Sequence, residues 1–433
     1  MDGKQKTFIF LFVVLLLSLP FSKAIANIAT YLLVAFSLLR LHETNFKELF
    51  FKYSHILGLV LIFLIYLAGI LYSTDLERGW SFIRGHQRFL LLPFIVLINK
   101  DYIVDRFKSL IAWYCGGMAA ASAFTLGFYF MPENTVVYLT NTLGFLREYE
   151  YSVHRTKFGL YNPFQARIQM SNLLAIASLG TLYLFFNSSR RLVFGGMFFL
   201  ILITNIMLGG RGGQLGMFAG LIVFGSLLLY FRYFPLMKKS LGKWRSIGVL
   251  LSSVFTGAVL LPLLIYQTVT PVQERYDLMI QEAHEFFDAD HSEVNYKHKT
   301  AARRLISWIN HWEAIKENFW IGVGPGDYRN TLEKTYKESP FDINPNAHSQ
   351  YLQIWLTSGI GALLIFFWVI FFWVRKSYSS GYTYIFAVSF IVFYLVSMIP
   401  DAILLRQVDN MAFSLFFSIL GLSSDVDAPD KGK

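Results

Sequence analysis

Residues 352–374 read LQIWLTSGIGALLIFFWVIFFWV, a stretch without a single charged side chain. A helix needs about 20 predominantly apolar residues to cross a bilayer, and this stretch is long enough. Similar runs recur along the chain, which is 55% hydrophobic and 15% charged with a mean hydropathy of +0.47. Soluble domains carry about 25% charged residues. The sequence therefore predicts an all-α polytopic membrane protein.

The apolar runs predict about twelve transmembrane helices, at residues 8–22, 24–41, 54–72, 88–99, 108–131, 166–187, 192–208, 212–231, 247–267, 352–374, 382–399 and 407–422. The first run has the length of a signal peptide, but no small-residue cleavage site follows it and further runs come at once, so we interpret it as the first span. The expected organisation is helices one to nine over residues 1–267 with an outer loop at 132–165, a large, partly helical periplasmic loop over 268–351, and helices ten to twelve with a cytoplasmic tail over 352–433.

Lys and Arg in the short loops indicate the orientation, because cytoplasmic loops of membrane proteins are enriched in them. If the N-terminus is cytoplasmic, the inside segments carry 19 of the 38 basic residues and 8 of the 28 acidic residues. The whole formal excess of +10 then falls on the cytoplasmic side. Both termini are expected to be cytoplasmic, and the basic balance is a topology signal, so we expect no nucleic-acid partner.

Arginines and histidines gather at the outer membrane boundary in this topology, namely Arg78, Arg84, Arg88, Arg147, His154, Arg155, Arg167, Arg211, Arg303, Arg304 and His348. An arginine at a bilayer edge is costly unless it snorkels, pairs or lines a wet cavity. Arg211 lies in LGGRGGQLG, residues 208–216, between two apolar runs. It is either a headgroup-snorkelling residue of a tight helical hairpin or a guanidinium placed to hold a phosphate bidentately.

The large loop carries its own helical pattern in TAARRLISWINHWEAIKENF, residues 300–319, with Leu305, Ile306, Trp308, Ile309, Trp312 and Ile315 approximating one apolar face. WIGVGPGDY, residues 320–328, predicts a helix stop and a turn. A second short helix is expected in DYRNTLEKTYK, and an extended approach in SPFDINPN leads to His348. We expect these segments to lie against the outer membrane face and to cap a cavity.

Other chemistries find little support. His284, His291 and His298 are spaced by seven residues, too far apart along a helix to bind one ion, so no metal site is expected. GVGPG lacks the Lys-Ser/Thr of a phosphate-binding loop, and no Gly-x-Ser-x-Gly elbow occurs. The single cysteine, Cys115, lies in an apolar run and is expected to be a core residue. No cofactor is expected.

Three ordered motifs carry a family resemblance: GGRGG between two spans, RLISW followed by IGVGPGDY in the large loop, and NAHSQYLQIWLTSGIGALL entering the next span. In order, spacing and topology they resemble the O-antigen ligase and O-antigen polymerase superfamily of bacterial inner membranes, over about residues 205–370. Ser349 stands where asparagine is common in that family.

The resemblance implies glycan transfer from an undecaprenyl diphosphate to an acceptor hydroxyl on the periplasmic side. Arg211, Arg304 and His348 match the family's functional positions, and Arg303 is a second choice beside Arg304. Arg84, Arg88 and Arg167 are further candidates for binding the diphosphate or the glycan. Two arginines would stabilise charge on the leaving group, and His348 would act as general base with inversion at the anomeric carbon. His348 binding the diphosphate, or capping a helix, are the alternatives.

The leading interpretation is an O-antigen ligase that transfers the polysaccharide to a lipid A-core sugar, with an O-antigen polymerase as the alternative. A protein O-oligosaccharyltransferase, a transporter and a non-catalytic receptor or scaffold are weaker alternatives. A transporter predicts internal repeats and ionisable residues near the bilayer midplane, whereas here the charges gather at the outer rim. The sequence does not indicate an oligomeric state.

Overall fold

The computed structural model describes residues 3–142, 160, 162–268, 270–288, 296, 299–339 and 347–428. It is 84% helical, and no strand occurs in those ranges. The helices are α1 (Gly3–Phe21), α2 (Lys23–Leu39), α3 (Phe46–Lys52), α4 (Gly58–Gly69), α5 (Leu76–His86), α6 (Arg88–Ile98), α7 (Lys100–Phe130), α8 (Glu133–Thr142), α9 (Arg167–Asn187), α10 (Arg191–Leu208), α11 (Arg211–Leu228), α12 (Phe234–Leu241), α13 (Lys243–Phe255), α14 (Leu261–Thr268), α15 (Thr270–Asp288), α16 (Thr300–Glu317), α17 (Tyr328–Glu338), α18 (Gln350–Lys376), α19 (Tyr382–Ser397), α20 (Gln407–Leu420) and α21 (Ser423–Val426).

Seven helical segments in the described ranges are long and apolar enough to cross a membrane, namely Gly3–Phe21, Leu76–Ile98, Lys100–Phe130, Arg167–Asn187, Arg191–Leu208, Arg211–Ser240 and Gln350–Lys376. Three shorter apolar segments, Lys23–Leu39, Gly58–Tyr72 and Tyr382–Ser397, accompany them. The all-α polytopic class is thus confirmed, while the count of twelve spans stays a prediction. The span predicted at 88–99 corresponds to α6. In the structure α5 and α6 together form one longer candidate span, Leu76–Ile98.

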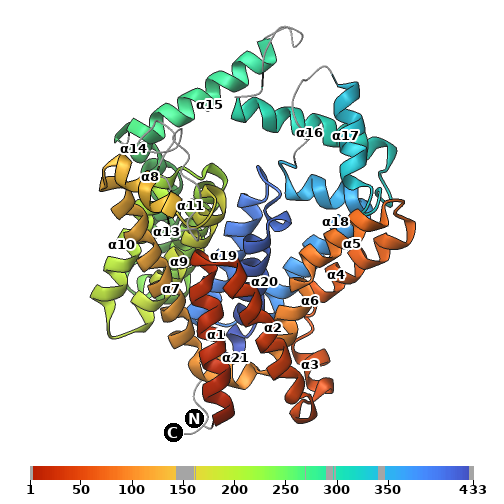
Figure 1. Ribbon diagram of the computed structural model, residues 1–433. Coiled ribbons are helices and arrows are strands. Elements are labelled where there is room, and N and C mark those ends of the chain that lie inside the picture. The colour runs from red at the N-terminus through yellow and green to blue at the C-terminus, as the bar shows by residue number, and fades with distance from the viewer. Residues whose placement is uncertain are drawn as a thin grey trace.

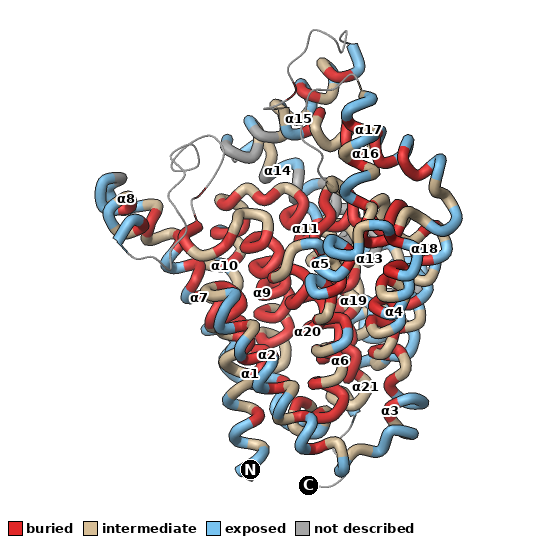
Figure 2. Tube along the Cα trace, turned by 45° about the vertical axis from the view of Figure 1, so that its right-hand side comes forward, coloured by how far each residue is buried: buried red, intermediate tan, exposed pale blue. Residues whose placement is uncertain are grey.

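The helices form a tall bundle with α9 and α20 at its centre (Figures 1 and 2). In α9, 83% of the apolar window is buried inside the protein, against 28% in the neighbouring α10. Most of α20 is buried as well. Helices α15, α16 and α17 cover one end of the bundle, and α1 begins at the opposite end (Figure 1). The helical segments of the large loop therefore sit together over one face.

Glycines of α11 allow it to pack closely against α9 and α19. A Cβ at Gly213 would lie 2.5 Å from Ser171 Oγ, and one at Gly216 would lie 2.5 Å from the Phe393 carbonyl oxygen. Gly209, with φ +77°, adopts the left-handed backbone conformation that ends α10. The GGRGG motif is therefore a hairpin turn followed by a packing face, and it makes Arg211 the first residue of α11.

The run at 352–374, which looks like one span in the sequence, is broken in the structure. Gly359 has φ +79° inside α18, so a short outer segment precedes the long apolar one. The break frees the carbonyl groups of Leu356 and Thr357, which accept hydrogen bonds from Val323 N and Gly324 N, both at 2.9 Å. The kink is thus the docking point for the turn between α16 and α17.

The helices predicted at 300–319 and within 327–337 are present as α16 and α17. The predicted apolar face of α16 is only partly right. Ile306 and Ile315 are fully buried, but Ile309 and Trp312 are each 42% exposed. The buried face of α16 also includes three polar residues, Ser307, Asn310 and His311. The extended approach expected at 339–346 lies almost entirely outside the described residues.

Candidate active site

Helix α16 positions the pair Arg303 and Arg304 above the ends of the spanning helices. Arg304 Nε donates a 3.2 Å hydrogen bond to the carbonyl oxygen of Pro400, in the turn after α19. Burial lowers the pKa of Arg304 from its ordinary value; Asp401 acts in the opposite direction, and Arg211 lowers the pKa further. The three groups therefore lie close enough to interact, although they come from distant parts of the chain.

Arg211 approaches the same place from α11. Its Nη1 donates a 3.2 Å hydrogen bond to Thr300 Oγ1, at the first residue of α16. Arg211 is also the first residue of α11, and the first turn of a helix carries unpaired backbone N–H groups that favour anions. Together with Arg304, it makes this corner strongly cationic.

A cavity of about 420 Å³ opens between α11, α15 and α16. Arg211 and Arg304 both line it. The rest of its wall is mainly apolar and comprises Gly212, Leu215, Met279, Ile280, Ala283, His284, Phe287, Ala301, Leu305, Trp308 and Pro400. An apolar wall with two guanidiniums suits an amphipathic ligand whose head is anionic.

His348 is held beside this cavity by its main chain. Trp308 Nε1 donates to the His348 carbonyl oxygen at 2.8 Å, and His348 N donates to Ser307 Oγ at 3.3 Å. Both partners belong to the RLISW motif that carries Arg304. Neither ring nitrogen of His348 has a hydrogen-bond partner among the described residues. The backbone of His348 is thus fixed beside the cavity, and its two ring nitrogens are buried without a partner in the described part of the chain.

Burial, together with the nearby guanidiniums, favours the neutral form of His348. Burial is the largest cause and lowers its pKa to about 4. Asp401 opposes this shift, whereas the nearby guanidiniums of Arg303, Arg304 and Arg406 add to it. A neutral imidazole can accept a proton, which is what a general base must do.

Asp401 and Arg406 complete the cluster, and the sequence interpretation did not include either residue. Arg406 Nη2 lies 2.9 and 2.8 Å from the two carboxylate oxygens of Asp401. The Asp401 side chain is 5% exposed. The available signal was an acid and a base close together in PDAILLRQ, residues 400–407, on the predicted outer side.

The remaining candidates are distributed unevenly. Arg303 acts electrostatically on His348 and so belongs to the cluster. Arg84 is exposed on α5. Arg88 is buried and donates to Asn27 Oδ1 at 2.7 Å and to the Gly85 carbonyl oxygen at 3.1 Å. Arg167 is the first residue of α9, and its carbonyl lies close to Gly210.

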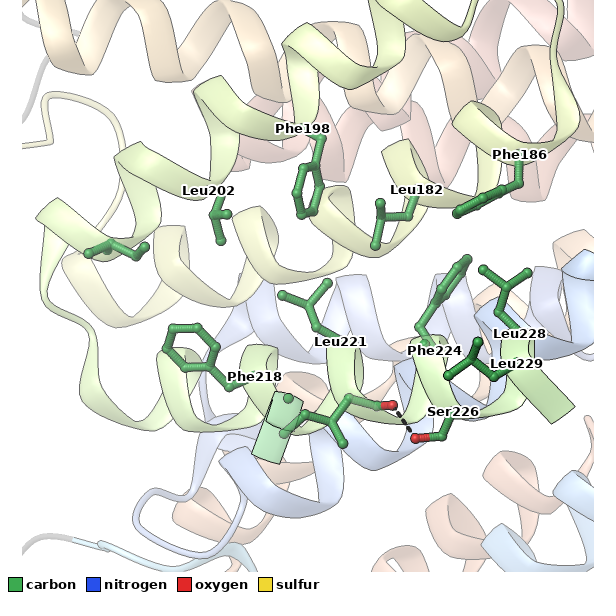
Figure 3. A pocket seen from close by; sticks show the side chains of 14 residues that line it. Leu182, Phe186, Phe198, Leu202, Phe218, Leu221, Phe224, Ser226, Leu228 and Leu229 are labelled. Atoms are coloured by element: carbon green, nitrogen blue, oxygen red, sulfur yellow. Dashed lines mark hydrogen bonds between the residues drawn. The ribbon is translucent and has the colours of Figure 1, made fainter. Parts of the chain in front are cut away.

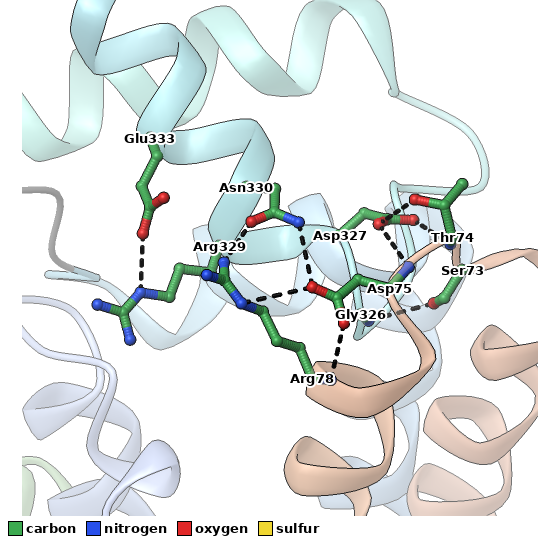
Figure 4. Close-up of polar contacts among 9 residues, drawn as sticks. All are labelled: Ser73, Thr74, Asp75, Arg78, Gly326, Asp327, Arg329, Asn330 and Glu333. Atoms are coloured by element: carbon green, nitrogen blue, oxygen red, sulfur yellow. Dashed lines mark hydrogen bonds and ion pairs between the residues drawn. The ribbon is translucent and has the colours of Figure 1, made fainter.

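Arg78, another arginine of the predicted rim, has structural partners. Arg78 donates to Asn330 Oδ1 and lies 3.4 Å from Asp75 Oδ2, which ties α5 to α17 (Figure 4). Arg147, His154 and Arg155 fall outside the described residues, as do His291 and His298. His284 is described and lines the cavity. Among the described residues no group of three or more His, Cys, Asp or Glu is placed to hold a metal ion.

Hydrogen bonds fasten the large loop to residues 73–75, in the turn that leads into α5. Asp327 Oδ2 accepts from Thr74 N at 2.6 Å and Oδ1 accepts from Asp75 N at 3.1 Å, while Ser73 Oγ accepts from Gly326 N at 3.1 Å (Figure 4). These contacts, with those to the kink in α18, hold both ends of the α16–α17 turn. The motif IGVGPGDY is thus a docking element that fixes the position of α16.

A second cavity, of about 440 Å³, lies within the bundle between α9, α10 and α11 (Figure 3). Its wall is apolar except for Ser226, whose hydroxyl already donates to the Ile222 carbonyl oxygen at 2.7 Å. Helix α11 lines this cavity from Phe218 onward and carries Arg211 at its outer end.

Comparison with known families agrees with the motifs. Residues 196–367 match the family model described as O-antigen ligase, a segment that contains Arg211, Arg303, Arg304 and His348. It leaves Asp401 and Arg406 outside, together with Arg84, Arg88 and Arg167. No curated protein matches the chain. The resemblance seen in the sequence is thereby confirmed at the level of the superfamily.

Proposed function

We propose, from the place in the O-antigen ligase superfamily that residues 196–367 support, that the protein transfers O-antigen polysaccharide from undecaprenyl diphosphate to a sugar hydroxyl of lipid A-core. The family itself supports ligase- or polymerase-type glycan transfer in a bacterial membrane. The observation that supports a diphosphate-linked donor is the pair Arg211 and Arg304 on the wall of an apolar cavity next to His348.

The donor diphosphate binds to the two guanidiniums. A polyprenyl diphosphate has an anionic head at the membrane surface, and guanidiniums match phosphate oxygens bidentately. As the glycosidic bond breaks, negative charge grows on the leaving diphosphate, and fixed cations stabilise it in the transition state. The guanidiniums thus supply charge stabilisation without a metal ion.

The lipid part of the donor lies along α11. Phe218 follows Arg211 by seven residues, about 10 Å along a helix axis, so an isoprenoid chain whose head is at Arg211 can reach the apolar cavity of Figure 3.

His348 removes the proton from the acceptor hydroxyl. Its main chain is fixed by Trp308 and Ser307, and neither ring nitrogen has a hydrogen-bond partner among the residues that the structure describes. Burial is the main cause of its pKa of about 4, and the guanidiniums of Arg303, Arg304 and Arg406 lower that pKa further. A bound diphosphate offsets those cations and raises the basicity of the imidazole as the donor arrives. The hydroxyl then attacks the anomeric carbon opposite the leaving diphosphate, so the configuration inverts.

The acceptor enters from the periplasm, since we assign the face covered by α15, α16 and α17 to that side and the protein to the inner membrane with both termini cytoplasmic. This assignment follows from the basic short loops. An epitope tag at each terminus should be cleaved by protease only after the cytoplasmic side is exposed.

A lipopolysaccharide gel of a deletion strain distinguishes ligase from polymerase. A ligase predicts loss of all O-chains while lipid-linked polymer accumulates. Core that carries a single repeat unit would instead assign the polymerase reaction to the same site.

A further inference from the structure

A buried carboxylate, Glu282 of α15, lies at the cationic corner of the cavity. It is 5% exposed, and its Oε2 accepts a hydrogen bond from Ala301 N at 2.6 Å. Ala301 is the second residue of α16, whose N-cap, Lys299, makes no side-chain cap. Glu282 therefore satisfies a free N–H group at the start of α16, where a negative charge is favourable.

The same carboxylate lies close to both candidate diphosphate ligands. Arg211 binds Thr300 at 3.2 Å, and Glu282 binds the next residue, Ala301, at 2.6 Å. Arg304 follows one turn later on the same helix, and Glu282 acts electrostatically on both guanidiniums. Ala283, next to Glu282, lines the cavity with the two arginines.

We propose that Glu282 is the resident counter-ion of Arg211 and Arg304, and that it competes with the diphosphate for them. This inference rests on the proposed function. A diphosphate at the two guanidiniums meets the charge of Glu282, and like charges at close range repel. Glu282 therefore limits how tightly the site holds a diphosphate and speeds the release of undecaprenyl diphosphate after transfer.

The variant E282Q removes the charge but keeps an oxygen that can accept from Ala301 N. It should bind farnesyl diphosphate, a short-chain probe, about tenfold more tightly, a factor equivalent to about 1.4 kcal/mol. In transfer assays both KM for the lipid-linked donor and kcat should fall, because the product is retained. If Glu282 only caps α16, weakening that cap in E282Q would raise KM for the donor or leave it unchanged.

Glu285, three residues on, provides the matched control. Its Oε2 lies 2.6 Å from Lys299 Nζ, and the charge that acts on it is Lys299. The variant E285Q loses a similar charge from the same helix away from the arginines. It should bind farnesyl diphosphate as the wild type does.

Calorimetric titration of the detergent-purified, full-length protein with farnesyl diphosphate tests the proposal. The variant E282D draws the carboxylate back by one methylene and should tighten binding in the same direction by a smaller factor, which decides the matter if E282Q unfolds. Unchanged or weaker affinity in these variants would overturn the counter-ion role and leave the proposed function standing. A wild-type protein that does not bind farnesyl diphosphate would contradict both.

Discussion

Trp308 Nε1 donates a 2.8 Å hydrogen bond to the carbonyl oxygen of His348. The bond joins the helix that carries Arg304 to a residue two positions before α18, across 40 residues of chain. It explains why an arginine and a tryptophan occur four residues apart in RLISW: one side chain reaches the cavity and the other fixes the histidine beside it.

Removing that bond should impair turnover more than binding. In W308F an aromatic six-membered ring remains but the N–H donor is lost, so His348 gains freedom to move. Misplacement of a catalytic group by about 1 Å can cost about 100-fold in rate, so kcat should fall by about ten- to 100-fold while KM for the donor changes little. W312F is the control, because Trp312 lies on the same helix, is 42% exposed and packs against Trp355. Equal losses in both variants would assign Trp308 to packing alone.

The pH dependence should report the low pKa of His348. Because that pKa is lowered to about 4, the imidazole is neutral above about pH 5, and kcat/KM should show no acid limb near 6.5, the pKa of an unperturbed histidine. The rate should fall only as the pH drops through about 4. The acid limb of kcat should lie at higher pH, since the bound diphosphate raises the basicity. Initial rates in a series of buffers check both limbs, and an acid limb of kcat/KM at 6.5 would argue against the buried base.

Arginine at position 211 should not be replaceable by lysine. R211K keeps the charge but loses the planar fork, so transfer should fall by at least about tenfold, the effect of losing about 1.4 kcal/mol of transition-state stabilisation. R84K is the matched control, because Arg84 is exposed on α5. Measured rates of glycan transfer decide the outcome. If R211K works as well as the wild type, the guanidinium is only a positive anchor.

The kink in α18 should be intolerant of a side chain. A Cβ at Gly359 would lie 2.5 Å from the Trp320 carbonyl carbon, and its φ of +79° disfavours any other residue. G359A should therefore detach the α16–α17 turn, abolish transfer and lower the melting temperature. G361A should behave as the wild type, since a Cβ there meets nothing within 4 Å. A melting curve and an activity assay of the two variants suffice, and an active, stable G359A would show that the docking is dispensable.

The sequence allowed prediction of the helical class and of the residues within motifs, and it failed where distant segments meet. Arg304 and His348 were identifiable because each lies in a recognisable motif. Asp401 and Glu282 were not, since neither lies in a recognisable motif and the role of each depends on its contact or charge interaction with α16, from the turn after α19 or from α15. The break at Gly359 was missed because residues 352–374 form one continuous apolar run, which predicts an unbroken helix. Arg88 looked like the other rim arginines, and only the fold shows that Asn27 and Gly85 already bind it.

Glycan transfer by the purified His348→Ala variant tests the central claim most directly. Wild-type and variant protein would be incubated with an undecaprenyl-diphosphate-linked glycan and lipid A-core, and the product followed on a gel, with membrane insertion checked by matched expression and melting curves. The account predicts a correctly inserted protein without transfer activity. Transfer at the wild-type rate by this variant would contradict the assignment of His348 as the base.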